Sequence, residues 1–267
     1  MVAATVVRRA RDVIITRATW GGTQNFLGAR WVAHLVKYAP ARIQGRAALW
    51  LLSLSPHYFY DRDIHAEAER NRRSRKVLAE TLVAPHVTPL ARVLDYGCGP
   101  GYMARAIADV AHHVDAVDIS RGVLECAKVL NGCPNITYMR PDELDGRPKA
   151  DLAYSFAVAQ HLPTESLVGM LRRLADQISS GGILLLHFAV PGQQGWRTET
   201  DVEGASFSGR LKLQYGLRCI GRTADEMERL VAVSGFSDIV IRPLRGTLSV
   251  PVDDDIANQH LLSARRS

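Results

Sequence analysis

The stretch Val-Leu-Asp-Tyr-Gly-Cys-Gly-Pro-Gly at residues 93–101 decides the fold expected for this chain. It predicts a short buried strand over residues 92–96, then a glycine turn and a helix that begins near Tyr102. The residues that let the backbone adopt positive φ and approach a ligand closely are Gly97, Gly99 and Gly101. Asp95 lies at the end of the strand, at the edge where open α/β sheets bind their ligands. The stretch therefore predicts a ligand site directly after this strand.

A second acidic residue, Asp118, closes the next apolar run, at residues 114–117. Its carboxylate is suited to accept hydrogen bonds from the two hydroxyl groups of a ribose. A glycine turn followed by such an acid also fits NAD or FAD, so a nicotinamide-dependent enzyme is one alternative. Two features disfavour it: the glycine spacing is Gly-x-Gly-x-Gly, and the carboxylate of Asp95 would repel a pyrophosphate. A ligand that carries an ammonium group fits this charge pattern better.

The 93–101 stretch resembles the first motif of the class I S-adenosylmethionine-dependent methyltransferases, which reads hydrophobic-hydrophobic-Asp-x-Gly-Cys-Gly-x-Gly. The resemblance implies S-adenosylmethionine as the cofactor. It also implies an α/β fold with a Rossmann-like, seven-stranded, mostly parallel sheet and helices on both faces. The donor-binding residues that it implies are Asp95, Gly97, Gly99, Gly101, Asp118, Ile119, Asp142, Glu143 and Phe156. Among them, Ile119 would pack against the adenine, and Asp142 would accept a hydrogen bond from the adenine amino group. Pro141 stands where the family usually has glycine.

The rest of the chain alternates strand and helix patterns, which predicts a parallel sheet. Further strands are predicted at residues 136–140, 150–156, 183–188, 238–242 and 260–264. In the resembling family the last two strands pair antiparallel at the sheet edge. Helices are predicted at residues 64–82, at 167–178 with Gly181 and Gly182 ending the helix, and from Thr223 to Gly235. We expect a basic helical N-terminal cap over residues 1–60 and a methyltransferase domain over 61–267, with an acceptor-site insertion at 191–222.

Two histidines lie where a general base would be useful: His161 just after the fourth strand, and His187 at the end of the fifth. A base assists methyl transfer when the acceptor is a hydroxyl. Each histidine also has a structural alternative, as a helix cap or loop hydrogen bond for His161 and as a core group for His187. The expected reaction is methyl transfer to oxygen of a small or lipid-like acceptor. Transfer to nitrogen or carbon, and a non-catalytic S-adenosylmethionine-binding module, are the alternatives.

Positive charge is concentrated in the predicted N-terminal cap. Residues 1–60 hold eight basic residues and one acid, whereas the net charge of the whole chain is +6. The tryptophans of the cap are Trp20, Trp31 and Trp50. This composition predicts peripheral membrane contact through residues 1–55, with a merely solvated basic face or RNA contact as alternatives. A nucleic-acid base is not the expected acceptor, because Phe156-Ala157-Val158-Ala159 stands where base-methylating enzymes have Asn/Asp-Pro-Pro-Tyr. The sequence leaves the oligomeric state open.

The four cysteines form no Cys-x-x-Cys pair, which predicts a reduced, cytoplasmic protein. An organellar transit peptide is an alternative for the arginine-rich start. The alternating acids and histidine over residues 61–69 would scatter around a helix axis, so we expect no metal site there.

Overall fold

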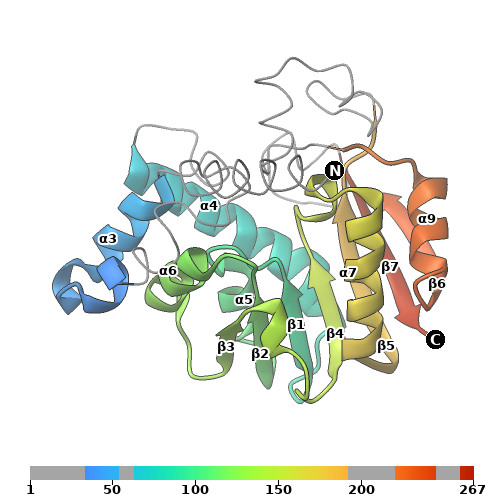
Figure 1. Cartoon of the computed structure of the whole chain (residues 1–267), viewed down its shortest axis with the longest axis horizontal. Coiled ribbons are helices and arrows are strands. Elements are labelled where there is room, and N and C mark those ends of the chain that lie inside the picture. Colours follow the sequence, from blue (N-terminus) through green and yellow to red (C-terminus); the bar gives the residue numbers. More distant parts are fainter. Residues whose placement is uncertain (1–33, 54–62, 192–219, 245–258) are drawn as a thin grey trace, which may run out of the picture.

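The computed structural model describes residues 34–53, 63–191, 220–244 and 259–267 of the chain. These residues form a seven-stranded sheet with the order β3-β2-β1-β4-β5-β7-β6 (Figure 1). The strands are β1 (Arg92–Tyr96), β2 (His113–Val117), β3 (Ile136–Met139), β4 (Ala150–Ser155), β5 (Ile178–Phe188), β6 (Phe236–Pro243) and β7 (His260–Arg266). The first five strands pair in parallel, and β7 pairs antiparallel with both β5 and β6. The predicted mostly parallel sheet is confirmed.

Helices cover both faces of this sheet, as expected. The helical segments are α3 (Ala41–Ser53), α4 (Ile64–Leu78), η1 (Ala79–Val83), η2 (Ala84–His86), α5 (Tyr102–Ile107), α6 (Arg121–Asn131), η3 (Pro141–Glu143), η4 (Ala159–His161), α7 (Thr164–Gln177) and α9 (Ala224–Ala232). The apolar side chains of η1 and α5 share one buried cluster with one face of the sheet. Those of α7 and α9 share a second cluster with the other face. Figure 1 shows α7 in front of the sheet and α4 behind it. The sheet therefore lies between two apolar layers that fix where its strands end.

Helix α3 packs on α6 and not on the sheet itself. Its buried side chains Ala48, Leu51 and Leu52 form a separate apolar cluster with Val123 and Cys126 of α6. Part of the predicted N-terminal cap is therefore helical and rests on the helix that follows β2. The rest of the predicted cap, at residues 1–33 and 54–60, and most of the insertion at 191–222 lie outside the described residues. The domain boundaries stay a prediction.

Two boundaries differ from the sequence prediction. The helix predicted to include Ile178 ends at Gln177, and Ile178 is the first residue of β5. Gly181 and Gly182 lie inside β5 and do not end the helix. The pairing of β4 with β5 shifts register between Ala150 and Leu152, and Gly181 has a φ of +76°. Glycine tolerates the positive φ of this irregular part of the strand, and sequence periodicity does not reveal strand register.

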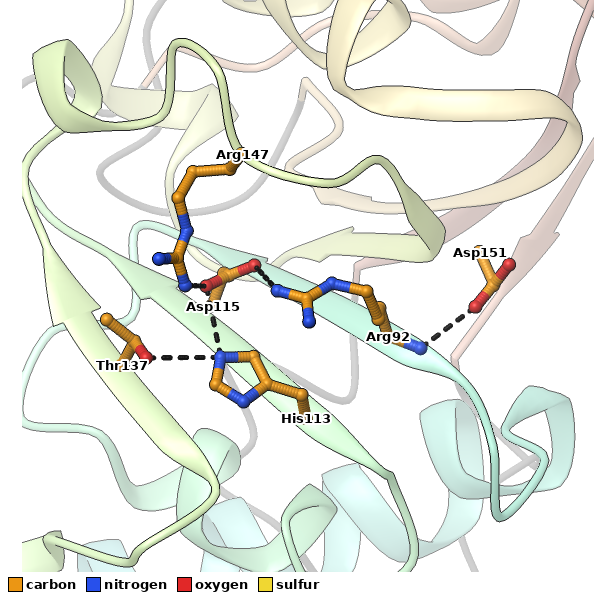
Figure 2. Close-up of polar contacts among 6 residues, drawn as sticks. All are labelled: Arg92, His113, Asp115, Thr137, Arg147 and Asp151. Carbon is orange, nitrogen blue, oxygen red and sulfur yellow. Dashed lines mark hydrogen bonds and ion pairs between the residues drawn. The ribbon is translucent and has the colours of Figure 1, made fainter.

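Figure 2 shows a cluster of charged side chains that includes Arg92 and His113, the first residues of β1 and β2. The glycine turn follows the other end of β1. The buried carboxylate of Asp115 accepts hydrogen bonds from Arg92 Nη2 at 2.8 Å and Arg147 Nη2 at 2.6 Å. His113 Nε2 lies 3.2 Å from the same carboxylate and 3.1 Å from Thr137 Oγ1. Burial lowers the pKa of His113. A buried carboxylate requires such partners. Arg147 lies in the connection between β3 and β4, so its ion pair with Asp115 holds this connection against the sheet. The helical segment of the connection is the short η3.

Candidate active site

The glycine turn after β1 has the conformation that the sequence predicts. The φ angles of Gly97, Gly99 and Gly101 are +86°, +50° and +81°. The backbone N–H groups of Gly97 and Cys98 both donate to the Val117 carbonyl, at 2.7 and 2.9 Å. A Cβ at Gly97 would collide with the side chain of Val158, and one at Gly101 would collide with Tyr138. The turn is therefore a tight cradle that only glycine allows at these positions.

Asp118 connects the end of β2 to this turn. Its Oδ2 accepts from the backbone N–H of Gly99 at 3.0 Å, and its Oδ1 accepts from that of Ser120 at 2.8 Å. Burial raises the pKa of Asp118, while the hydrogen bonds from Ser120 and Gly99 lower it. Each carboxylate oxygen has a second lone pair that can accept a hydrogen bond from a ligand. The next residue, Ile119, is 49% exposed and offers an apolar surface beside this carboxylate.

Asp95 is buried at the end of β1 and has an unusual proton affinity. Burial raises the pKa of Asp95 to about 7, with the Tyr154 hydroxyl opposing the rise and the charge of Asp118 adding to it. Among the described residues, neither Asp95 Oδ2 nor Tyr154 Oη completes a hydrogen bond of good geometry. Buried polar atoms normally have partners, so an orphaned carboxyl oxygen at the carboxyl edge of the sheet indicates a place for a ligand's hydrogen-bond donor.

The predicted acids after β3 lie in η3, and both make local contacts with Arg140. The backbone N–H of Asp118 donates to Met139, the last residue of β3, at 3.1 Å. In η3, Glu143 Oε2 accepts from the backbone N–H of Arg140 at 2.7 Å. Asp142 has a side chain that is 65% exposed and pairs with Arg140 Nε at 3.0 Å. The hydrogen bond from Arg140 lowers the pKa of Asp142. Adenine contact through Asp142 stays a prediction.

The turn after β4 is held by His187 from the end of β5. His187 Nδ1 accepts the backbone N–H of Ala157 at 3.2 Å, and Ala157 has a φ of +58°. The imidazole ring stacks on the Phe156 ring, with centroids 5.4 Å apart and planes 15° apart. Burial, together with the positive charges of Arg75 and His161, lowers the pKa of His187 to about 3. His187 is therefore neutral at physiological pH and a poor proton acceptor.

His161 ends η4, and a buried arginine fixes that segment. Arg222 Nη1 donates to the Ala159 carbonyl at 3.0 Å, and Nη2 donates to the Leu162 carbonyl at 2.7 Å. Its side chain is 2% exposed and also lies 3.5 Å from Glu226. Sequence reasoning missed Arg222, and its one local signal is its place just before the capping residue Thr223.

The predicted site residues thus gather at one edge of the sheet. The glycine turn, Asp95 and Asp118 follow β1 and β2, and η3 follows β3. Phe156, His161 and His187 follow or end β4 and β5, which are the next strands in the sheet. Within the described ranges, no group of three His, Cys, Asp or Glu side chains is placed to hold a metal ion. The same residues include no helix with the length and apolar character needed to cross a membrane.

Comparison with known proteins gives one consistent family. Residues 93–182 match the family described as a methyltransferase domain. Trans-aconitate 2-methyltransferase from Agrobacterium fabrum (strain C58) is 35% identical over 125 residues, which cover 44% of this chain and 44% of that protein. tRNA U34 carboxymethyltransferase from Shewanella sediminis is 35% identical over 117 residues, which cover 40% of this chain and 35% of that protein. The chain thus spans less than half the length of each of these two relatives.

A solved structure gives the same result for the fold. Magnesium protoporphyrin IX methyltransferase from Synechocystis PCC 6803, with bound SAH, has a TM-score of 0.54 and 21% identity, covering 82% of this chain and 93% of that chain. At this identity the likeness concerns the fold alone. The motif at residues 93–101, the strand order and the match over residues 93–182 agree, and all three support a class I S-adenosylmethionine-dependent methyltransferase domain.

Proposed function

We propose that this chain is an enzyme that transfers the methyl group of S-adenosylmethionine to an oxygen atom of a small or lipid-like acceptor. The observation that carries the proposal is the cradle of positive-φ glycines between two buried acids, Asp95 and Asp118. The cradle at Gly97 and Gly101 is space that a Cβ would fill. The orphaned Oδ2 of Asp95 suits the ammonium group of the methionine part. The residues present therefore fit the cofactor.

The residues of the chain would act mainly by positioning. Bound S-adenosylmethionine supplies an electrophilic methyl carbon next to a cationic sulfur. Asp118 would hold the ribose hydroxyls, and Ile119 would cover one face of the adenine. Phe156 and the turn after β4 would form the wall toward the acceptor. Holding two reactants in line removes much of the entropic part of a displacement barrier.

An oxygen acceptor is supported by the kind of relative that the chain matches. The Agrobacterium relative is named for trans-aconitate, a molecule that has carboxylate groups and no amine. Two kinds of oxygen make different demands on the site: a hydroxyl needs a base, for which His161 is the candidate, and a carboxylate needs none. Nucleic acid stays the less favoured acceptor, although one relative is named for a tRNA nucleotide.

Binding of S-adenosylhomocysteine tests the donor site directly. We expect calorimetry to detect binding, and Asp118→Ala to weaken it by about tenfold to 100-fold because a charge-assisted hydrogen-bond acceptor is lost. Asp109→Ala is the matched control, since the Asp109 side chain is 63% exposed on the surface. An unchanged dissociation constant in Asp118→Ala would remove that residue from the site. Binding without turnover on any acceptor would identify a non-catalytic module.

Helix α3 supports a peripheral contact with an anionic membrane, which we propose as the setting of a cytoplasmic enzyme. Residues 34–53 contain no acid. Arg42, Arg46 and Trp50 follow one another at four-residue spacing and are all exposed, Trp50 by 52%. Exposed cations beside an exposed aromatic ring fit the headgroup region of an anionic bilayer. The described cysteines are free thiols, as a reducing compartment would keep them.

A further inference from the structure

The carbonyl groups of the glycine turn accept hydrogen bonds from other groups of the chain. The Cys98 carbonyl accepts from the N–H of Gly101 at 2.9 Å, and the Gly101 carbonyl accepts from the N–H of Arg105 at 2.9 Å. The Gly99 carbonyl accepts from the thiol of Cys98 at 3.6 Å. Each of these donors lies within four residues of its carbonyl. The carbonyl of Pro100 is different, because its donor comes from another helix.

That donor is Asn131, the last residue of α6. Asn131 Nδ2 donates to the Pro100 carbonyl at 2.8 Å, although the two residues are 31 positions apart in the sequence. Asn131 is buried, at 7% exposure. A buried carbonyl that loses its donor costs more free energy than the hydrogen bond itself contributes. The conformation of the turn therefore depends on one side chain that the turn does not supply.

The hydroxyl of Tyr138 in β3 fixes the end of α6 in turn. Tyr138 Oη donates to the backbone carbonyl of Asn131 at 3.0 Å. Burial raises the pKa of Tyr138, so the hydroxyl keeps its proton at physiological pH. The Tyr138 ring also lies against Gly101, where an added Cβ would collide with it. Tyr138 therefore contacts both the turn and the helix end that supports it.

Helix α6 consequently holds the turn from both of its ends. Just before its start, the Asp118 carboxylate accepts the N–H of Gly99, and it also accepts the N–H of Ser120, the N-cap residue. At its end, Asn131 donates to the Pro100 carbonyl. These two attachments lie on either side of the Gly99–Pro100 bond. Because an α-helix is a rigid element, they hold the turn in one conformation.

We propose that Asn131 is a positioning residue for S-adenosylmethionine, and that it holds the glycine turn in its binding conformation before the ligand arrives. The inference rests on the proposed function and adds a residue that acts through the Pro100 carbonyl. A turn that is already ordered loses less conformational entropy when it binds a ligand, and the difference is seen as affinity. Tyr138 supports the same conformation through the carbonyl of Asn131.

Calorimetry with S-adenosylhomocysteine on the full chain tests this role. Asn131→Leu keeps the approximate size of the side chain but removes the amide, so it should weaken binding about tenfold. Asn135→Leu is the matched control, because Asn135 Nδ2 donates to the carbonyls of Ala108 and Ala111, at 2.8 and 3.1 Å, outside the turn. This control should bind S-adenosylhomocysteine within threefold of wild type, even if both variants unfold at a lower urea concentration.

Hydrogen exchange separates positioning from a general loss of structure. In ligand-free Asn131→Leu, the amides of residues 97–102 should exchange at least about tenfold faster than in wild type, while those of β5 stay protected. Asn135→Leu should leave exchange in the turn unchanged. Tyr138→Phe removes a single hydroxyl and should weaken S-adenosylhomocysteine binding about threefold. Its effect should not add to that of Asn131→Leu, because both residues belong to one hydrogen-bond network.

The outcomes separate failure of the inference from failure of the proposed function. Affinity within threefold of wild type in Asn131→Leu would overturn the inference, and so would equal losses of affinity in Asn131→Leu and Asn135→Leu. If Asn131→Leu does not fold, wild-type affinity together with wild-type exchange of the turn in Tyr138→Phe would overturn it instead. A wild-type chain that does not bind S-adenosylhomocysteine contradicts the proposed function itself.

Discussion

The two sides of the candidate site are built in different ways. The donor side consists of Asp95, the glycine turn and Asp118, which lie close together in the sequence at the ends of β1 and β2. The acceptor side consists of the turn after β4 with His161, together with His187 and Arg222. One side uses backbone conformation and hydrogen bonds within the β1–β2 unit. The other uses side chains that come from segments far apart in the sequence. We therefore expect the two sides to respond differently to substitution.

Gly97→Ala should have the largest effect, because Gly97 of the donor side packs against Val158 of the turn after β4. The alanine would be strained at a φ of +86°, and its Cβ would collide with Val158 of the turn after β4. Strain of this kind costs about 1–3 kcal/mol of stability. We expect calorimetry to show that the affinity for S-adenosylhomocysteine falls about 100-fold, because the displaced turn would no longer contact the ligand at the same distances. Gly146→Ala, also at positive φ but with open space around it, is the control for backbone strain alone. Equal loss of affinity in both variants would contradict this account.

Arg222→Met should separate the sides most clearly. It leaves the carbonyls of Ala159 and Leu162 without their donor, which should lower the free energy of unfolding by about 3 kcal/mol. The hydrogen bonds described for this guanidinium reach Ala159, Leu162 and Thr164, which lie after β4, so S-adenosylhomocysteine affinity should remain within threefold at temperatures where the chain is folded. Urea unfolding and calorimetry measure the two quantities. If the affinity for S-adenosylhomocysteine and the free energy of unfolding both fell, the two sides would form a single unit, which would contradict their independent response to substitution.

The pH dependence of stability tests the donor side. The folded chain holds the Asp95 proton more tightly than the unfolded chain does, because the pKa of Asp95 rises to about 7 on burial. The contribution of Asp95 to the free energy of unfolding therefore falls by roughly 2–4 kcal/mol as pH rises from about 4 through about 7. Asp95→Asn should remove that loss, and be more stable than wild type at pH 8, while binding S-adenosylhomocysteine more weakly. Urea unfolding at pH 5 and pH 8 provides the check. A wild-type chain that gains stability over this range relative to Asp95→Asn would show the opposite sign.

The smallest expected effect concerns α3, which lies on neither side of the site but could deliver a lipid-like acceptor to it. In co-sedimentation with vesicles rich in anionic lipid, Arg46→Glu should lower binding by about 1–2 kcal/mol, and added salt should weaken the binding of wild type. Trp50→Ser should also lower it, whereas Val233→Ser should not, although Val233 is 62% exposed. If the intact chain ignores such vesicles at low salt, the membrane proposal is wrong and α3 is only a solvated cap.

Most of the fold was accessible to sequence reasoning, because its signals are local. Apolar runs, together with the family resemblance of residues 93–101, predicted the seven strands, and the glycine turn predicted the start of α5. The end of α7 was misplaced because Ile178 continues the apolar pattern while its backbone already pairs with Ala150 of β4. The candidate site was accessible to the extent that it is a motif. His187 was singled out by its position at a strand end, but its neutral state and the hydrogen bond that its Nδ1 accepts follow from contacts that no spacing encodes.

The sequence by itself determined the methyltransferase motif, the strands of the sheet, and the positions of the glycine turn with Asp95 and Asp118, since each depends on residues close together in the chain. Only the tertiary structure decided that Arg222 ties the His161 segment to the start of α9, and that His187 of β5 holds the turn after β4. These groups are separated by many residues and meet because burial of two apolar layers brings their helices and strands together. Their charges and protonation states then depend on desolvation and on neighbours supplied by the fold.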